Sequence, residues 1–238
     1  MIDPSRIRAL AFDVFGTVVD WRSSIIREGA AWSRDYGIEA DWAAFADAWR
    51  GLYQPALSKV RSGELPWTRL DDLHRMALDQ ILPQFGLAHL DREARRRINT
   101  VWHRLDPWPD SVAGLTRLKA RHIVAPVSNG HVALIVAMAK RAGLPWDVVL
   151  GAEVAQAYKP DPAVYLTAAD MLGVAAGEMM MVAAHNGDLA AARSLGLRTA
   201  FVRRPTEWGP GQTIDLEAEP GADLAVESIE ELADRLNC

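Results

Sequence analysis

Short apolar runs alternate with amphipathic stretches through the second half of the chain. The apolar runs, each of a length typical of a buried strand, fall at residues 122–127, 147–150, 178–184, 198–202 and 222–226. Apolar residues recur at helical spacing in other segments, at residues 131–142, 162–172, 188–195 and 228–236. Strands that alternate with helices of this length predict strand–helix–strand units and a parallel sheet.

The first half of the chain has a different pattern. Residues 7–12 (IRALAF) predict one isolated buried strand, and no further strand pattern follows for some eighty residues. Helical patterns occur instead near residues 22–36, 41–59, 67–84 and 91–104. The turn-forming segment 106–110 (DPWPD) then leads back into the alternating region. We therefore predict an α/β fold: a Rossmann-like parallel-sheet core from residues 1–17 and 107–238, with residues 18–106 inserted as an all-helical cap domain.

Composition restricts the environment and the partners. The chain has 238 residues, of which half are apolar, and a net charge of −5, which argues weakly against a nucleic acid or an anionic membrane as partner. Its single cysteine, Cys238, cannot form an internal disulfide, and this suits a reducing compartment. The start of the chain lacks a leader pattern, and no apolar run reaches the ~18 residues of a membrane span. We expect a cytoplasmic protein.

Polar residues follow the predicted strands where those strands end. They are Asp13, the run Ser128-Asn129-Gly130, Lys159, and the run from His185 to Asp188. Each has a simple structural explanation, such as an Asx turn, a helix N-cap or a surface lysine. In an open parallel sheet, however, ligands bind at the carboxyl ends of the strands. Their order along successive strand ends therefore favours one shared site.

The order DxxGT (Asp13 to Thr17), SNG, Lys-Pro-Asp and a final Asp188 resembles the haloacid dehalogenase superfamily over nearly the whole chain. The resemblance implies that Asp13 is a nucleophile, that Thr17 and Ser128 take part in binding, and that Lys159 neutralises charge.

Two positions separate the branches of this superfamily. Its phosphatases carry a second acid where this chain has Phe15. They also carry an acidic pair in the last motif, where this chain has Ala183 and Ala184 in the region of the first acid and keeps only Asp188. Magnesium prefers oxygen ligands, and phosphoryl transfer without the metal loses its main charge neutraliser. The L-2-haloacid dehalogenase branch is more similar, with an aromatic residue at position 15, the run Tyr158-Lys-Pro-Asp161, Tyr165, and a cap Trp-Arg pair at Trp49-Arg50. This resemblance implies no metal and no cofactor.

The resemblance implies a displacement in two steps on a short (S)-2-haloalkanoic acid. Asp13 attacks the α-carbon and forms an aspartyl ester, which water then hydrolyses to a 2-hydroxy acid. Two carboxylates brought to ~4 Å repel by about 4 kcal/mol at an effective dielectric near 20, so fixed cations are required. We expect Lys159 beside Asp13, Ser128 on the substrate carboxylate, and Arg50 with Asn129 on the halide. Arg22 competes with Arg50 because it is closer to Asp13 in sequence, and Asp188 is expected to activate the water.

One motif departs from the better-known dehalogenases. Where they carry Ser-Ser-Asn, this chain has Ala183-Ala184-His185. We expect His185 either to orient the water or to crowd the halide pocket, or else to be a hydrogen-bonded core histidine. A pocket tightened by His185 and Trp67 favours a small halide, including fluoride from fluoroacetate.

Three other interpretations of the function remain open. The protein is then a metal-dependent phosphatase, an enzyme that hydrolyses a strained carbon–nitrogen or carbon–oxygen ring, or a catalytically silent binding protein on the same fold. The resemblance also leaves a homodimer open.

Overall fold

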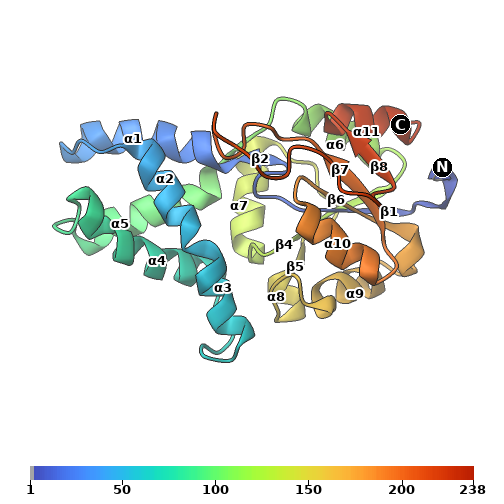
Figure 1. Cartoon of the computed structure of the whole chain (residues 1–238), viewed down its shortest axis with the longest axis horizontal. Coiled ribbons are helices and arrows are strands. Elements are labelled where there is room, and N and C mark those ends of the chain that lie inside the picture. The colour runs from blue at the N-terminus through green and yellow to red at the C-terminus, as the bar shows by residue number, and fades with distance from the viewer. Residues whose placement is uncertain (1–2) are drawn as a thin grey trace.

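The computed structural model describes residues 3–238 and shows a helical half beside a half that contains the sheet (Figure 1). Within these residues six parallel strands form one sheet in the order β5-β4-β1-β6-β7-β8. The strands are β1 (Ala9–Phe12), β4 (Ile123–Ser128), β5 (Leu150–Gly151), β6 (Met179–Ala183), β7 (Arg198–Val202) and β8 (Leu224–Val226). The predicted parallel sheet is confirmed. Strand β1 lies between β4 and β6, so its carboxyl end opens at the centre of the sheet.

Alternate residues of the central strands enter two separate cores. Leu10 and Phe12 of β1 belong to the core shared with α6 (Ser111–Lys119), α7 (Val132–Ala142) and α11 (Ile229–Arg235). Ala9 and Ala11 face the opposite core, with α9 (Pro162–Met171) and α10 (Asn186–Ser194). Because both faces are covered, the strands are continuously apolar rather than alternating. The remaining elements of this half are η1 (Pro4–Arg6), α8 (Ala152–Ala155) and η4 (Ala176–Glu178).

The helical half follows β1, as the pattern of residues 18–106 predicts. Its elements are α1 (Trp21–Tyr36), α2 (Trp42–Gly51), α3 (Tyr53–Arg61), α4 (Leu70–Ile81), η2 (Leu82–Phe85), α5 (Arg92–Asn99) and η3 (Thr100–Arg104). The side chains of Asp20, Asp41 and Asp91 accept hydrogen bonds from the first-turn amides of α1, α2 and α5. The core of this half is continuous with one core of the sheet.

Some boundaries differ from the prediction. The segment 41–59 is two helices, and α4 begins at Leu70 rather than at residue 67. The segment 147–150 contributes only its last residue to a strand, and helix α6 was not predicted. A two-stranded ribbon of β2 (Val19–Asp20) and β3 (Asp106–Pro107) joins the two ends of the helical half, which the sequence pattern did not indicate. None of the helices between residues 3 and 238 combines the length and apolarity that a bilayer span requires.

Candidate active site

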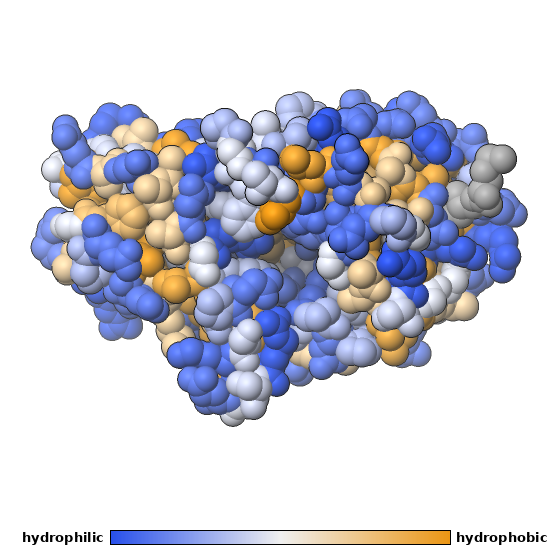
Figure 2. All heavy atoms as spheres, viewed as in Figure 1, coloured by the Kyte–Doolittle hydropathy of each residue, from blue (hydrophilic) through white to orange (hydrophobic). Residues whose placement is uncertain are grey.

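A cavity of about 400 Å³ lies at the carboxyl end of β1. Figure 2 shows the molecular surface hollowed between the two halves. The wall is formed by residues of the sheet half and by three from the helices above it, Arg50, Tyr53 and Gln54. The other residues of the wall are Asp13, Phe15, Asn129, Lys159, Pro160, Tyr165, His185, Gly187, Asp188, Trp208 and Asp215. The predicted shared site at the strand ends is therefore a real cavity.

Asp13 is held by the turn that follows β1. Its amide donates to the carbonyl of Val182 at 2.9 Å, so the neighbouring strand β6 fixes its backbone. The Thr17 hydroxyl donates to Asp13 Oδ2 at 2.9 Å and accepts from the Ala184 amide at 2.9 Å. Thr17 does not line the cavity; it orients the carboxylate from behind. Thr17 thereby engages Oδ2, while Oδ1 faces Lys159.

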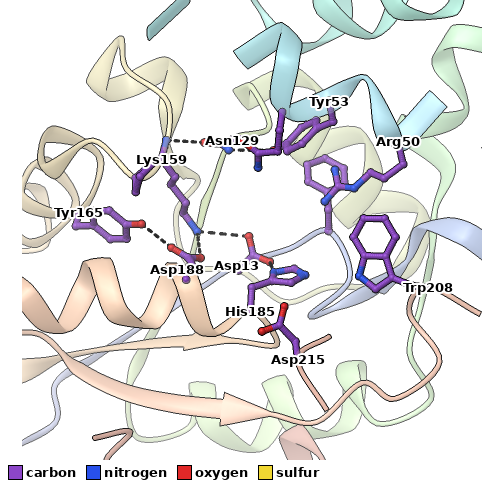
Figure 3. Close-up of a pocket in the computed structure, with 14 residues that line it drawn as sticks. Asp13, Arg50, Tyr53, Asn129, Lys159, Tyr165, His185, Asp188, Trp208 and Asp215 are labelled. Atoms are coloured by element: carbon purple, nitrogen blue, oxygen red, sulfur yellow. Dashed lines mark hydrogen bonds and ion pairs between the residues drawn. The ribbon is translucent and has the colours of Figure 1, made fainter. Parts of the chain in front are cut away.

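Lys159 lies between two carboxylates. Its Nζ is 3.4 Å from Asp13 Oδ1 and 2.6 Å from Asp188 Oδ2, and Tyr165 donates to Asp188 Oδ1 at 2.6 Å (Figure 3). Burial lowers the pKa of Lys159, but Asp188 and Asp13 outweigh it and the pKa is raised. Burial raises the pKa of Asp13, but Lys159, then His185 and Thr17, bring it below its ordinary value. The pair is therefore an ammonium and a carboxylate at neutral pH.

His185 approaches the same carboxylate from the other side. Its Nδ1 lies 3.2 Å from Asp13 Oδ2, and its Nε2 lies 2.9 Å from Glu207 Oε2. Glu207 is buried and also accepts from Trp21 Nε1 at 3.0 Å. Burial lowers the pKa of His185, but Glu207 and Asp13 outweigh it, and the pKa lies well above its ordinary value. His185 is hydrogen-bonded, as the core-histidine interpretation expects, but its ring lines the cavity between two acids.

Arg50 brings a positive charge into the cavity. Its guanidinium carbon lies 4.0 Å from the ring centroid of Tyr53, 5.5 Å from Trp21 and 5.9 Å from Trp208. Figure 3 shows it beside the rings of Tyr53 and Trp208. Among residues 3–238, nothing accepts a hydrogen bond from its buried Nη1. A buried guanidinium donor without an acceptor is suited to binding an anion.

Asn129 links the cavity floor to the helices. Its Oδ1 accepts from the Lys159 amide and its Nδ2 donates to the Tyr53 hydroxyl, both at 2.9 Å. Phe15 lines the cavity and packs edge-on against Trp102, with ring centroids 6.0 Å apart. The structure thus brings Asp13, Phe15, Arg50, Asn129, Lys159, Tyr165, His185 and Asp188 together.

Three predicted placements need correction. Trp67 does not line the cavity; it packs on Tyr158, with ring centroids 4.9 Å apart. Ser128 is fully buried below the cavity wall, where its Oγ accepts from the Gly130 amide at 3.1 Å. Arg22 does not line the cavity and forms a bidentate pair with Asp47, at 2.7 and 2.8 Å. Arg22 therefore does not compete with Arg50 for an anion in the cavity.

Sequence reasoning missed several residues of the site. Tyr53 and Gln54 follow Arg50 closely in the chain, and this proximity is a usable signal. Glu207, Trp208 and Asp215 come from the long loop between β7 and β8, whose sequence has no periodic pattern. That loop begins at the carboxyl end of β7, and this position is the signal that could have indicated that the loop contributes to the site.

The donor set does not fit the magnesium ion of a phosphatase. The ammonium group of Lys159 occupies the space between the carboxylates of Asp13 and Asp188. Phe15 and the buried Ala183 and Ala184 offer no side-chain oxygen. The charge that a metal would neutralise is met here by protein cations.

Residues 7–196 match the family of haloacid dehalogenase-like hydrolases. The chain belongs to this family. The resemblance expected from the strand-end motifs is confirmed, and so is the α/β fold.

Three relatives of this haloacid dehalogenase-like hydrolase are informative. An enzyme from Burkholderia cepacia named (S)-2-haloacid dehalogenase 4A is 30% identical over 208 residues, which cover 83% of this chain and 84% of that protein. The solved L-2-haloacid dehalogenase PA0810 is 48% identical, with a TM-score of 0.94 and coverage of 97% and 99%. The solved defluorinating L-2-haloacid dehalogenase Rha0230 is 46% identical, with a TM-score of 0.95 and coverage of 98% and 96%.

Proposed function

We propose that this hydrolase cleaves the carbon–halide bond of short (S)-2-haloalkanoic acids and releases 2-hydroxy acids. The observation that carries the proposal is that one cavity holds both an ionised, oriented Asp13 and Arg50, whose buried Nη1 has no acceptor among residues 3–238. A nucleophile and an anion site that face each other suit a displacement in which an anion leaves. The names of the three relatives support the same reaction.

In the first step Asp13 Oδ1 attacks the α-carbon. A bond forms between that oxygen and carbon, the carbon–halide bond breaks, and the halide leaves with the electron pair toward Arg50. No proton is required, which agrees with Phe15 at the position where an acid would otherwise stand. Lys159, 3.4 Å from Oδ1, offsets the repulsion between Asp13 and the substrate carboxylate.

In the second step water attacks the carbonyl carbon of the ester, and the ring of His185, by then neutral, takes a proton from that water. In the free enzyme the charge of Asp13 helps to keep His185 protonated. Ester formation removes that charge and lowers the proton affinity of the ring, so that the ring releases its Nδ1 proton to solvent before the water attacks. Glu207 holds the ring by its Nε2 and leaves Nδ1 facing the reaction centre. The bond between the carbonyl carbon and the substrate oxygen then breaks, and that oxygen receives the proton from His185 as the hydroxy acid leaves. The second proton of the water passes from the Asp13 carboxyl group to His185 and restores the ion pair of the free enzyme.

The assignment of water activation to Asp188 stays a prediction, but geometry favours His185. Both oxygens of Asp188 are engaged, one by Lys159 and one by Tyr165. We propose that Asp188 instead positions the ammonium group of Lys159. If Asp188 is the base, Asp188→Asn accumulates the ester on Asp13 while His185→Gln does not; the reverse pattern supports His185.

The decisive experiment is halide release from the separate enantiomers of 2-chloropropionate, in EDTA, for the wild type and Asp13→Asn. We expect release from the (S) form that requires Asp13 and does not require metal. Fluoroacetate belongs in the same series, because one relative at 46% identity is a defluorinating enzyme. No release, together with magnesium-dependent cleavage of p-nitrophenyl phosphate, would establish the phosphatase alternative.

A single turnover in H₂¹⁸O, with enzyme in excess, tests the covalent step. We expect an unlabelled hydroxy acid and ¹⁸O in the peptide that contains Asp13, because the oxygen transferred to product comes from the carboxylate. Label in the first product molecule would mean that water attacks the substrate directly.

We also propose that residues 18–106 act as a cap over the core formed by residues 1–17 and 107–238. Support comes from the β2–β3 ribbon, which brings both connections to the helical half side by side. Arg61 of α3 donates to the Lys159 carbonyl at 2.9 Å and holds the two halves together.

A cytoplasmic location and a homodimer stay predictions. Analytical ultracentrifugation of the purified protein measures the oligomeric state.

A further inference from the structure

A second cluster of polar side chains lies outside the Asp13 cavity, where the helical half meets the sheet half. Asp71 comes from α4, His103 from η3, and His131 immediately precedes α7. None of the three lines the Asp13 cavity. Helix α7 packs against η3, and Figure 1 shows it on the side of the sheet toward the helical half. The mechanism above uses none of these residues.

The three potential ligand atoms are close enough for one ion. Asp71 Oδ2 is 2.8 Å from His103 Nε2 and 3.5 Å from His131 Nε2, and one ligand atom from each residue lies within 4.8 Å of the others. Ligands of a tetrahedral Zn²⁺ at 2.0–2.2 Å are separated by about 3.3 Å. The two measured contacts lie on either side of that value.

His131 is the second, independent observation. Its side chain is 6% exposed, yet its Nδ1 has no hydrogen-bond partner anywhere in residues 3–238. Its Nε2 lies 3.5 Å from Asp71 Oδ2, which is the outer limit of a hydrogen bond. An ion between Asp71 and His103 would give Nε2 a close partner, whereas Nδ1 lies on the other side of the ring and is not a ligand atom of this cluster. The side chains of Asp71 and His103 are 28% and 19% exposed, so an ion can enter from solvent.

We propose that Asp71, His103 and His131 form a binding site for one Zn²⁺ ion, with water as the fourth ligand. Imidazole and carboxylate donors suit Zn²⁺ and disfavour Mg²⁺, which prefers six oxygen ligands. The ion ties α4 and η3 to the loop before α7. That loop also carries Asn129, which holds the Lys159 backbone. The site is therefore structural, and it fastens the cap to the core beside the cavity.

The test uses the full chain without an affinity tag, stripped with EDTA that is then removed. Calorimetric titration with ZnCl₂ is expected to show one equivalent bound, and MgCl₂ none. His103→Ala and Asp71→Asn are expected to weaken binding at least about 10-fold. His89→Ala is the matched control, since His89 is an exposed cap histidine outside the cluster. Co²⁺ in place of Zn²⁺ is expected to give the visible absorption of a tetrahedral ion.

Stability gives a readout that does not depend on catalysis. With free Zn²⁺ at one hundred times its Kd, the Tm of the wild type is expected to rise by about 5–10 °C. The rise is expected to persist in His89→Ala and to disappear in His103→Ala and Asp71→Asn. A wild type without saturable Zn²⁺ binding, or equal binding in all variants, would overturn the proposal and leave a simple imidazole–carboxylate hydrogen bond.

Discussion

Replacing Glu207 by Gln tests the proposed role of His185 most directly. The substitution keeps the size of the side chain and an acceptor for Trp21 Nε1, but it removes the negative charge 2.9 Å from His185 Nε2. With the charge centres ~4 Å apart and an effective dielectric near 20, the lost attraction is about 4 kcal/mol. This free energy corresponds to proton binding by His185 that is weaker by up to about 1,000-fold.

Two measurements follow this change. Titration of ¹⁵N-histidine-labelled protein by NMR, with the His185 signal assigned from His185→Gln, is expected to show a lower pKa for His185 in Glu207→Gln. Rapid-quench kinetics are expected to show ester formation near the wild-type rate and ester hydrolysis slowed ~10²-fold or more, because the base is weaker and its ring is less well held.

A control variant separates the effect of the Glu207 charge from the effect of its hydrogen bond with Trp21. Trp21→Phe removes the other hydrogen bond of Glu207 without touching His185, and we expect it to leave the titration of His185 nearly unchanged. Ester hydrolysis in Glu207→Gln at the wild-type rate would refute the reasoning. An unchanged titration of His185 would refute it as well.

The other predictions concern Arg50, the support of Asp13 by Thr17, the turn at Gly16, and the dependence of stability on pH. Arg50→Ala is expected to lower turnover by about 10²–10³-fold, because it removes a donor that faces the charge developing on the halide. Arg22→Ala is the control and is expected to keep turnover, because Arg22 pairs with Asp47. Steady-state halide release measures both variants. Thr17→Val leaves the Ala184 amide unpaired and is expected to cost about 1–3 kcal/mol of unfolding free energy in urea, together with slower ester formation. Gly16→Ala is expected to lower the Tm by several degrees, because φ is 88° and the added Cβ would lie 2.1 Å from Glu207 Oε1; Gly187→Ala, where nothing lies within 4 Å, is the control. The raised pKa of His185 stabilises the folded state, and this stabilisation is fully present below the unfolded-state pKa of ~6.5. It is lost as pH rises through the folded-state pKa. Urea denaturation from pH 6 upward is therefore expected to show that the wild type is more stable than Glu207→Gln, by a difference that shrinks with rising pH.

The sequence determined the sheet, its parallel direction, and the residues where its strands end. Those features are local: apolar run length, helical spacing and caps such as Asp161, whose side chain accepts from the Ala163 amide. The sequence alone predicted that one site contains Asp13, Lys159 and Asp188, because parallel strands present their carboxyl ends at one edge of a sheet. The helical insertion was equally visible, since it lacks any strand pattern.

Only the tertiary structure decided which polar groups face one another across the cavity. Arg22 and Arg50 are indistinguishable by type, but Asp47 pairs with the first while aromatic rings and a cavity surround the second. Ser128 and Trp67 follow plausible motifs, yet packing turns both away from the cavity. Glu207 is 22 residues from His185 in the chain, and the pKa of that histidine depends on an approach of 2.9 Å. Coulomb interactions act through space and depend on burial, so separation along the chain does not reveal them.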